Sequence, residues 1–197
     1  MIIKSIRKMY DKTLELSKHP RAVFYLMLVS FSESIFSPIP QDVMLLPMML
    51  ANKSKAFYFA TMALIASVLG GLAGYFVGEL LFNEIAMPIL ELYGYMPKME
   101  ALKEMFTQYG WWIVVVGGLT PVPYKVITIT SGAMGLSLPV FIVAAIVSRA
   151  MRFYLLAFLT HLLGDKILEF VDKYFAILTI LATVLLVGGF ALVKVVL

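Results

Sequence analysis

The chain alternates long apolar runs with short polar segments, and two of the apolar runs are interrupted at their centres. The run 22–51 is broken by the polar segment 32–42, and the run 111–138 is broken by 117–125, each break containing a Pro-x-Pro. Each apolar arm makes about 15 Å of helix, half of a ~30 Å hydrocarbon core. A proline inside a helix costs ~3 kcal/mol or more, whereas a hairpin that turns back inside the layer avoids this cost. We therefore predict two re-entrant helical hairpins, at 22–51 and 111–138.

Each predicted hairpin is followed by an unbroken apolar run that is long enough to cross a membrane with some tilt. The first, 56–82, has 27 residues and makes about 40 Å of helix, and the second is 139–163. Small residues recur every four positions in the first run, at Ala66, Gly70, Gly74 and Gly78. Such a stripe lets helix backbones approach closely in lipid, so we interpret it as a helix-packing surface.

The two hairpin-plus-helix units repeat one another in pattern. A shift of 83 residues superposes the two Pro-x-Pro motifs, and Asp42 then falls on Lys125. Because one span separates the units, the second enters from the opposite side, as in inverted repeats whose broken helices meet near the midplane. The predicted tips contain eight residues of interest: Ser37, Pro38, Pro40, Gln41, Thr120, Pro121, Pro123 and Tyr124.

Further segments flank the membrane domain, which we expect at 22–165. Residues 1–21 combine apolar residues at helical spacing with lysines and arginines, which predicts an amphipathic helix on the membrane surface. Residues 83–110 form a polar amphipathic segment with a net charge of −2, and 166–197 form a loop and a C-terminal transmembrane helix. The positive-inside rule then predicts a cytoplasmic N-terminus and an external location for 83–110.

Composition supports this architecture, because 61% of the 197 residues are hydrophobic, only 14% are charged, and the mean hydropathy is +0.93. A soluble domain has about one-half apolar and one-quarter charged residues. The predicted fold class is therefore an all-α integral membrane protein built on an inverted repeat. Catalytic motifs, metal-ligand spacings, cofactor fingerprints and nucleic-acid motifs are missing from the sequence, so we expect no enzyme, no cofactor and no nucleic-acid partner.

Five ionisable residues fall inside the predicted apolar layer, with a formal sum of +1. They are Glu33, Asp42, Lys125, Arg149 and Arg152. Each charge at the bilayer centre costs at least ~2.5 kcal/mol, so these side chains must pair, face a wet cavity, or do both. One interpretation is an internal salt-bridge network, with Asp42 paired to Lys125 and Glu33 paired to an arginine.

The other interpretation of these charges is a substrate site inside the membrane. Arg149 and Arg152 lie three positions apart on one helix face, and two adjacent guanidinium groups suit a phosphate or a carboxylate. Burial raises the pKa of a carboxyl group and a nearby arginine lowers it, so Glu33 and Asp42 are also candidates for proton coupling.

Three segments carry a family resemblance: FSESIFSPIPQD at 31–42, GGLAGYFVG at 70–78 and GGLTPVPYKVITITSG at 117–132. Together they resemble the DedA family, also called SNARE-associated or VTT-domain proteins, and within it the YqaA-like branch. The resemblance implies a multi-pass protein of the cytoplasmic (inner) membrane that moves polyprenyl-phosphate carriers or phospholipids between leaflets, with Glu33 and Asp42 as its acidic pair.

The basic residues depart from the family pattern. Typical members have an arginine just before the second tip's first proline and another shortly after it, whereas here Thr120 precedes that proline and Lys125 follows it. Arg149 and Arg152, on the next helix, are candidates to supply the positive charge that the tip lacks. The departure leaves open which lipid is carried.

The first functional hypothesis is a lipid flippase or scramblase, whose partners are membrane lipids with an anionic headgroup. A phosphate would lie between the tips, against Lys125, Arg149 and Arg152. The second hypothesis is an ion- or proton-coupled transporter of a small soluble anion, which needs the same charges. The third is a non-transporting assembly protein in which the charges are internal struts and the small-residue stripe of 66–78 binds a partner.

Overall fold

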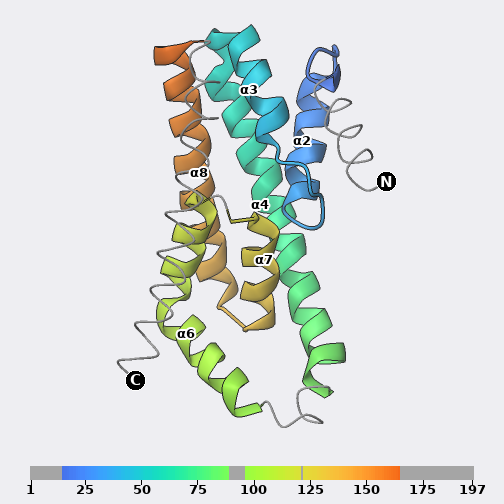
Figure 1. Cartoon of the computed structure of the whole chain (residues 1–197), viewed down its shortest axis with the longest axis vertical. Coiled ribbons are helices and arrows are strands. Elements are labelled where there is room, and N and C mark those ends of the chain that lie inside the picture. The colour runs from blue at the N-terminus through green and yellow to red at the C-terminus, as the bar shows by residue number, and fades with distance from the viewer. Residues whose placement is uncertain (1–14, 89–95, 121, 165–197) are drawn as a thin grey trace.

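The computed structural model describes residues 15–88, 96–120 and 122–164, and all regular secondary structure in these ranges is helical (Figure 1). The all-α prediction is therefore confirmed for this part of the chain. Most of the predicted N-terminal amphipathic helix and the predicted C-terminal transmembrane helix lie outside the described residues.

Six α-helices are described, together with two short irregular turns of helix. The α-helices are α2 (Ala22–Glu33), α3 (Asp42–Ala51), α4 (Ala56–Leu81), α6 (Met96–Leu119), α7 (Tyr124–Ala133) and α8 (Leu138–Leu163). A 3-10 turn, Lys53–Lys55, precedes α4, and a π-helical turn, Phe82–Ala86, follows it.

Proline and glycine set several of these boundaries. Pro38 and Pro40 lie between α2 and α3, where they remove two backbone donors and prevent one continuous helix. Pro123 directly precedes α7. Gly135, at φ +70°, turns the chain between α7 and α8, and Pro139 occupies the first turn of α8, which tolerates proline.

Within the described residues, two helices are long and apolar enough to cross a membrane: the continuous helical stretch Lys53–Glu84, which contains α4, and α8. Large apolar side chains cover their outer surfaces. Those exposed by more than 40% include Ile65, Leu69, Phe76, Leu80, Val143, Ile146, Leu155 and Phe158. A soluble protein seldom exposes so large an apolar surface, so this pattern fits a molecule whose solvent is lipid.

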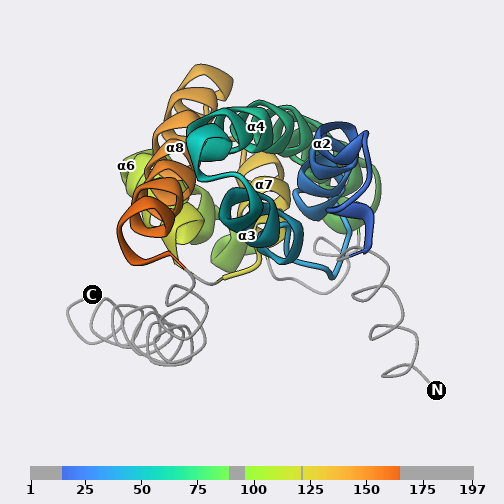
Figure 2. The same cartoon turned by 90° about the horizontal axis from the view of Figure 1, so that it is seen from above.

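The helices are arranged in two halves along the long axis of the molecule. Figure 1 shows α2 and α3 in the upper half and α6 and α7 in the lower half, with the α2–α3 and α6–α7 turns near the middle. The longer helices α4 and α8 contribute to both halves, and seen from above α3 and α7 lie between α2 and α8 (Figure 2). The α2–α3 turn and the described ends of α6 and α7 therefore lie near the centre of the molecule.

One boundary differs from the sequence-based expectation. The sequence suggests an external segment up to residue 110 and a new arm from 111, but α6 runs through this position without a break to Leu119. Glycine commonly ends a helix, but Gly110 packs against the side chain of Leu136 in the α7–α8 connection. The helix can therefore continue, because the glycine fills a tight packing position rather than a turn.

Two separate apolar cores stabilise the two halves. The upper core joins α2, α3, the first half of α4 and the second half of α8, and includes Leu26, Met44, Met49, Ala60 and Phe153. The lower core joins the end of α4 with α6, α7 and the first half of α8, and includes Tyr75, Phe106, Val114, Tyr124 and Phe141. Polar side chains from both turns lie between these cores.

The small-residue stripe of α4 brings this helix against α2 and α7. A Cβ atom at Gly70 would overlap the backbone carbonyl of Phe31 at the end of α2, and one at Gly78 would overlap the carbonyl of Ile129 in α7. A Cβ at Gly74 would meet Thr128 and the carbonyl of Ser34. Because the absent side chains permit this approach, α4 packs on the inner ends of both hairpins.

Candidate functional site

Four charged residues meet where the two halves join, and we call them the central charge cluster: Glu33, Asp42, Arg149 and Arg152. Glu33 ends α2 and Asp42 begins α3, so the α2–α3 turn brings both carboxylates to the centre. The two arginines project from one face of α8 because they lie three residues apart. All four side chains interact electrostatically, and their formal charges sum to zero.

Arg149 is the most deeply buried member, with 1% of its surface exposed. Its guanidinium lies between two aromatic rings, 4.4 Å from the ring centroid of Tyr124 and 4.6 Å from that of Phe153. Its Nε donates a hydrogen bond to Ser67 Oγ at 2.9 Å, and its Nη2 is 3.9 Å from Glu33 Oε2. The Glu33 carboxylate also accepts the backbone N–H of Gln41 at 3.1 Å.

Arg152 links both turns and is less buried. Its Nη2 donates to Asp42 Oδ2 at 2.5 Å, and its Nη1 donates to the backbone carbonyl of Thr120 at 3.3 Å. The side chains of Arg152 and Asp42 are each 20% exposed. This pair is therefore accessible to an incoming ligand, as is Glu33 at 16% exposed, whereas Arg149 is buried.

The salt-bridge interpretation of the sequence proposed that Lys125 pairs with Asp42, but the structure shows other partners for both residues. Lys125 Nζ donates instead to the backbone carbonyls of Ser37 and Phe36, at 3.1 and 3.4 Å, and Asp42 pairs with Arg152. Thr128 Oγ1, one turn further along α7, donates to the Ser34 carbonyl at 2.9 Å. The physical reason is that the α2–α3 turn leaves several carbonyls without helical partners, and α7 supplies donors for them.

Several buried polar atoms around the cluster have no hydrogen-bond partner within the described ranges. They are Asp42 Oδ1, Tyr124 Oη, Arg149 Nη2 and both side-chain atoms of Gln41. Each such group costs about 1–3 kcal/mol when it is left unpaired. Native structures contain few of them, and several together indicate a place where a polar ligand or water binds.

The remaining predicted tip residues are placed as follows. Ser37 Oγ accepts the backbone N–H of Ile39 at 3.2 Å, and Thr120 Oγ1 donates to the Gly117 carbonyl at 3.1 Å, so both hydroxyls stabilise their own turns. Pro38, Pro40 and Pro123 are exposed, whereas Gln41 and Tyr124 are buried. Pro121 lies outside the described residues.

Sequence reasoning missed two residues that contact Arg149 directly, Ser67 and Phe153. Ser67 lies one residue after Ala66 in an apolar helix, so its hydroxyl was a signal that a polar partner exists. Phe153 lies four residues after Arg149 on the same face of α8. In an apolar helix, nothing in the sequence distinguishes a phenylalanine that contacts the arginine from the other apolar residues around it.

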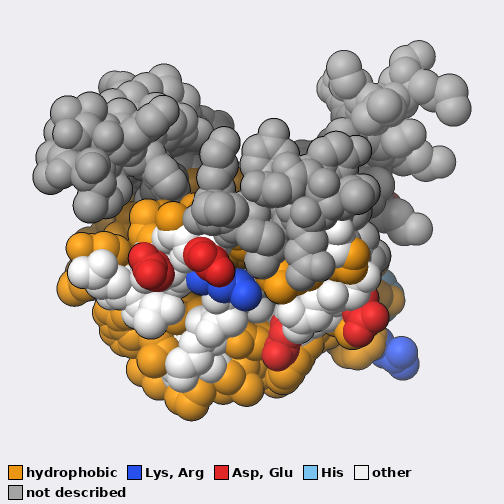
Figure 3. Space-filling view, turned by 90° about the horizontal axis from the view of Figure 1, so that it is seen from below, with side chains coloured by type: hydrophobic (Ala, Val, Ile, Leu, Met, Phe, Trp, Pro, Cys, Tyr) orange, Lys and Arg blue, Asp and Glu red, His pale blue; other side chains and the backbone are white. Residues whose placement is uncertain are grey.

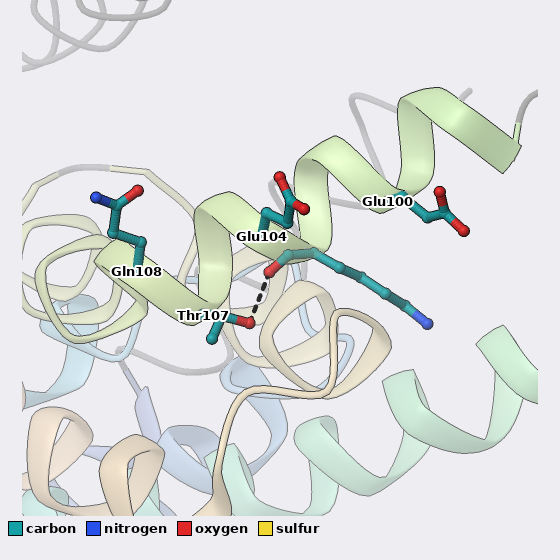
Figure 4. A pocket seen from close by; sticks show the side chains of 5 residues that line it. Glu100, Glu104, Thr107 and Gln108 are labelled. Atoms are coloured by element: carbon teal, nitrogen blue, oxygen red, sulfur yellow. Dashed lines mark hydrogen bonds between the residues drawn. The ribbon is translucent and has the colours of Figure 1, made fainter.

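A second polar surface lies at the far end of α6, away from the cluster. Figure 3 shows charged side chains gathered at this end of the molecule, with apolar side chains around them. A groove of about 410 Å³ is lined by Glu100, Lys103, Glu104, Thr107 and Gln108, and the labelled side chains in Figure 4 all come from α6. The described residues include no group of His, Cys, Asp and Glu that fits a metal ion.

Comparison with known proteins gives a family match and two relatives. A family model for the VTT domain matches residues 39–162. An uncharacterized protein of Haemophilus influenzae is 40% identical over 192 residues, 98% of this chain and 100% of that relative. An uncharacterized protein of Histophilus somni is 36% identical over 164 residues, 83% of this chain and 85% of that relative. No solved structure matches. The family match confirms the resemblance drawn from the sequence.

Proposed function

The chain belongs to the VTT domain family, the domain of DedA and SNARE-associated proteins, and we propose that it moves a phosphate-bearing lipid between membrane leaflets. The substrate in this proposal is a polyprenyl phosphate or a phospholipid. The family is generally membrane-associated, and the apolar outer surface of α4 and α8 agrees with a membrane protein. We further propose that this is a multi-pass protein of the cytoplasmic membrane with its N-terminus in the cytoplasm.

The proposed architecture is an inverted repeat of two re-entrant hairpins. In support, α2 and α3 occupy one half of the molecule, α6 and α7 the other, and both turns lie near the middle (Figure 1). An inverted repeat of this kind explains why donors of α7 and α8 bind the carbonyls and the carboxylate of the α2–α3 turn. Transporters of several folds have their substrate site where such broken helices meet.

The observation that carries the proposal is a buried arginine, Arg149, that has spare hydrogen-bonding capacity and lies near the partly exposed Arg152 inside a largely apolar molecule. Arg149 Nη2 has only a carboxylate at 3.9 Å, and Tyr124 Oη and the Gln41 amide lack partners among the described residues. A phosphate accepts several hydrogen bonds and suits guanidinium groups. Lipid tails can remain in the bilayer beside the exposed apolar face while the headgroup enters the centre.

In the proposed mechanism the headgroup competes with the carboxylates for the arginines. The phosphate first replaces Asp42 at Arg152, because this pair is partly exposed, and Lys125 adds a positive charge beside the α2–α3 turn. A proton taken up by Asp42 or Glu33 removes a negative charge and favours this exchange. Release of the phosphate re-forms the pairs, which lowers the cost of burying the charges in the empty protein.

Reconstitution into vesicles tests the proposal. Purified protein is incorporated into phosphatidylcholine vesicles containing fluorescent phosphatidic acid, phosphatidylglycerol or a polyprenyl phosphate, and exchange is measured by quenching of the outer leaflet. A fluorescent ceramide without phosphate is the lipid control. We expect exchange of a phosphate lipid that is abolished in Arg149→Ala and Arg152→Ala, and retained in Lys53→Ala, whose side chain is exposed at the end of the molecule. Circular dichroism establishes that each variant is folded.

Normal exchange in a folded Arg149→Ala/Arg152→Ala double variant would exclude the proposed site. Flux of a soluble anion without lipid exchange would support the transporter of small anions instead. A lack of any flux, together with a stable complex after mild solubilisation, would support the assembly protein.

A further inference from the structure

A chain of buried hydroxyl groups reaches Arg149 from α2 and α4. Arg149 Nε donates to Ser67 Oγ at 2.9 Å, Ser67 Oγ is 3.1 Å from Ser34 Oγ, and Ser34 Oγ lies 3.1 Å from the carbonyl of Ser30. Neither Ser34 nor Ser67 is exposed to solvent. The chain therefore connects α8, α4 and α2 inside the molecule.

The directions of these hydrogen bonds follow from the number of protons. A hydroxyl group has one proton to donate, and a carbonyl can only accept. When Ser34 donates its proton to the Ser30 carbonyl, it accepts a hydrogen bond from Ser67. Ser67 consequently gives its proton to Ser34 and presents a lone pair to Arg149 Nε. The direction at Ser67 is fixed by Arg149, because a guanidinium N–H can only donate, so Ser67 acts on Arg149 as an acceptor.

Among the described residues, Ser67 is the hydrogen-bond acceptor that the Arg149 guanidinium contacts. The rings of Tyr124 and Phe153 have their centroids 4.4 and 4.6 Å from the guanidinium carbon, and such cation–π contacts are less directional than a hydrogen bond. The Glu33 carboxylate, at 3.9 Å, is too far away for a hydrogen bond. The bond from Nε to Ser67 is directional, and it sets where Nη2 points.

We propose that Ser67 is a positioning residue that holds the Arg149 guanidinium in the orientation that binds phosphate, and so sets the affinity of the central site for the headgroup. This inference rests on the proposed lipid transport, which it deepens. Ser67 does not touch the headgroup itself. Its loss leaves Arg149 charged and buried, but free to turn between the two rings toward Glu33.

Ser67→Ala tests this role against a matched control, Ser148→Ala. Ser148 is also fully buried and is the neighbour of Arg149 in the chain, but its hydroxyl donates only to the Ala145 carbonyl of its own helix, at 3.1 Å. The two variants therefore remove the same group, and only one removes a contact of Arg149. Ser67→Cys is a second variant that preserves packing, because a thiol fills similar space and is a weak acceptor.

The first measurement is exchange of fluorescent phosphatidic acid in phosphatidylcholine vesicles as its mole fraction is varied. We expect Ser67→Ala to raise the mole fraction that gives half-maximal exchange by about 10-fold or more, with a smaller change in the maximal rate, because a hydrogen bond to a charged group is lost. Ser67→Cys also raises the mole fraction that gives half-maximal exchange, and Ser148→Ala leaves this mole fraction unchanged. An equal rise in the control, or no rise in Ser67→Ala, overturns the proposal.

The second measurement does not depend on transport. The chain has four arginines, so the Nε–H signals in a ¹⁵N–¹H spectrum are few, and the signal of Arg149 is assigned by its loss in Arg149→Lys. We expect this signal to shift in Ser67→Ala and to stay in place in Ser148→Ala. An unmoved signal overturns the positioning role. A shifted signal in a protein that exchanges no lipid retains the positioning role and overturns the proposed function.

Discussion

Single residues at the centre of the molecule differ in how firmly they are held. Arg152 is hydrogen-bonded to Asp42 and to the Thr120 carbonyl, whereas among the described residues Arg149 has one hydrogen bond, two aromatic rings and a carboxylate at 3.9 Å. Arg149 is thus well desolvated but incompletely bonded. A group in this state binds an additional acceptor strongly, since most of the cost of burying the charge has already been met by the fold.

Gln41 offers a test of whether the unpartnered atoms serve function at the expense of stability. Its side chain is 1% exposed and neither amide atom has a partner among the described residues. Gln41→Met keeps the volume and removes the unpaired donors and acceptor, so we expect the free energy of unfolding to rise by about 1–3 kcal/mol and lipid exchange to fall. Thermal unfolding and vesicle exchange measure the two effects.

The matched control for this substitution is Gln108→Met, because Gln108 is an exposed glutamine on α6. It should change neither quantity. A Gln41→Met protein that is more stable and still exchanges lipid at the normal rate would show that the amide is not part of the site.

Variants of the Asp42–Arg152 pair distinguish a substrate site from a salt bridge that only stabilises the fold. Asp42→Asn and Arg152→Gln each leave one charge without its partner, so each should destabilise the protein by about 1–3 kcal/mol. The double variant leaves no uncompensated charge, and we expect it to regain most of this stability while exchange remains lost. Chemical unfolding and vesicle exchange are measured for the unchanged protein, the two single variants and the double variant, which completes the double-mutant cycle.

The strut hypothesis makes the opposite prediction for the same double variant. If the pair only stabilises the fold, recovery of stability brings recovery of whatever activity the protein has. Exchange restored in Asp42→Asn/Arg152→Gln would therefore remove Asp42 and Arg152 from the proposed site.

Among the helices, α4 determines how closely the two hairpins approach. Its glycines place the α4 backbone against the carbonyls of Phe31 and Ile129, one from each half of the molecule. The same close contact lets α7 reach the α2–α3 turn, where Thr128 donates to the Ser34 carbonyl. The stripe therefore connects helix packing to the geometry of the central cluster.

Gly78→Ala tests this role of α4. The added Cβ would overlap the Ile129 carbonyl, and backbone cannot move aside as a side chain can, so we expect a loss of about 1–3 kcal/mol in unfolding free energy. In Gly110→Ala the new Cβ meets only the end of the Leu136 side chain, and the ~1 kcal/mol gain in helix propensity offsets the crowding. The stabilities of the two variants are compared by thermal unfolding in the same detergent. Equal stabilities would argue against close backbone packing at Gly78.

The sequence predicts helices better than it predicts contacts. The breaks at the two Pro-x-Pro motifs are visible because proline has a local effect on the backbone. The continuity of α6 through Gly110 is not visible, because it depends on packing against Leu136, a residue distant in the chain. The buried charges were identifiable from their cost in lipid, but the pairing of Asp42 with Arg152 rather than Lys125 depends on how α8 faces α3.

On the scale of the whole molecule, two apolar cores are joined by a polar layer. The upper core holds α2 and α3 against α4 and α8, and the lower core holds α6 and α7 against the same two helices. The contacts between the halves at the centre are hydrogen bonds and ion pairs, which exchange partners more readily than packed apolar side chains. Each half can therefore remain intact while contacts between the turns change, as the proposed transport requires.

The arrangement of the two hairpins across a membrane gives the last prediction. Re-entrant hairpins return to the side from which they enter, so residues that flank one hairpin must lie on the same side. Lys18 precedes α2 and Ser54 follows α3, whereas Glu100 lies near the start of α6 and Ser137 follows α7; all four side chains are exposed. Because the chain contains no cysteine, single cysteine substitutions at these positions report their location without background.

We expect a membrane-impermeant maleimide to label Glu100→Cys and Ser137→Cys in intact cells, and Lys18→Cys and Ser54→Cys only after permeabilisation. Basic residues near the first pair, including Arg21, Lys53 and Lys55, place it in the cytoplasm by the positive-inside rule. A straight span would separate the members of a pair, so labelling of Lys18→Cys and Ser54→Cys from opposite sides would exclude a re-entrant first hairpin. Labelling of all four from one side would exclude the inverted repeat, because α4 must then fail to cross the membrane between them.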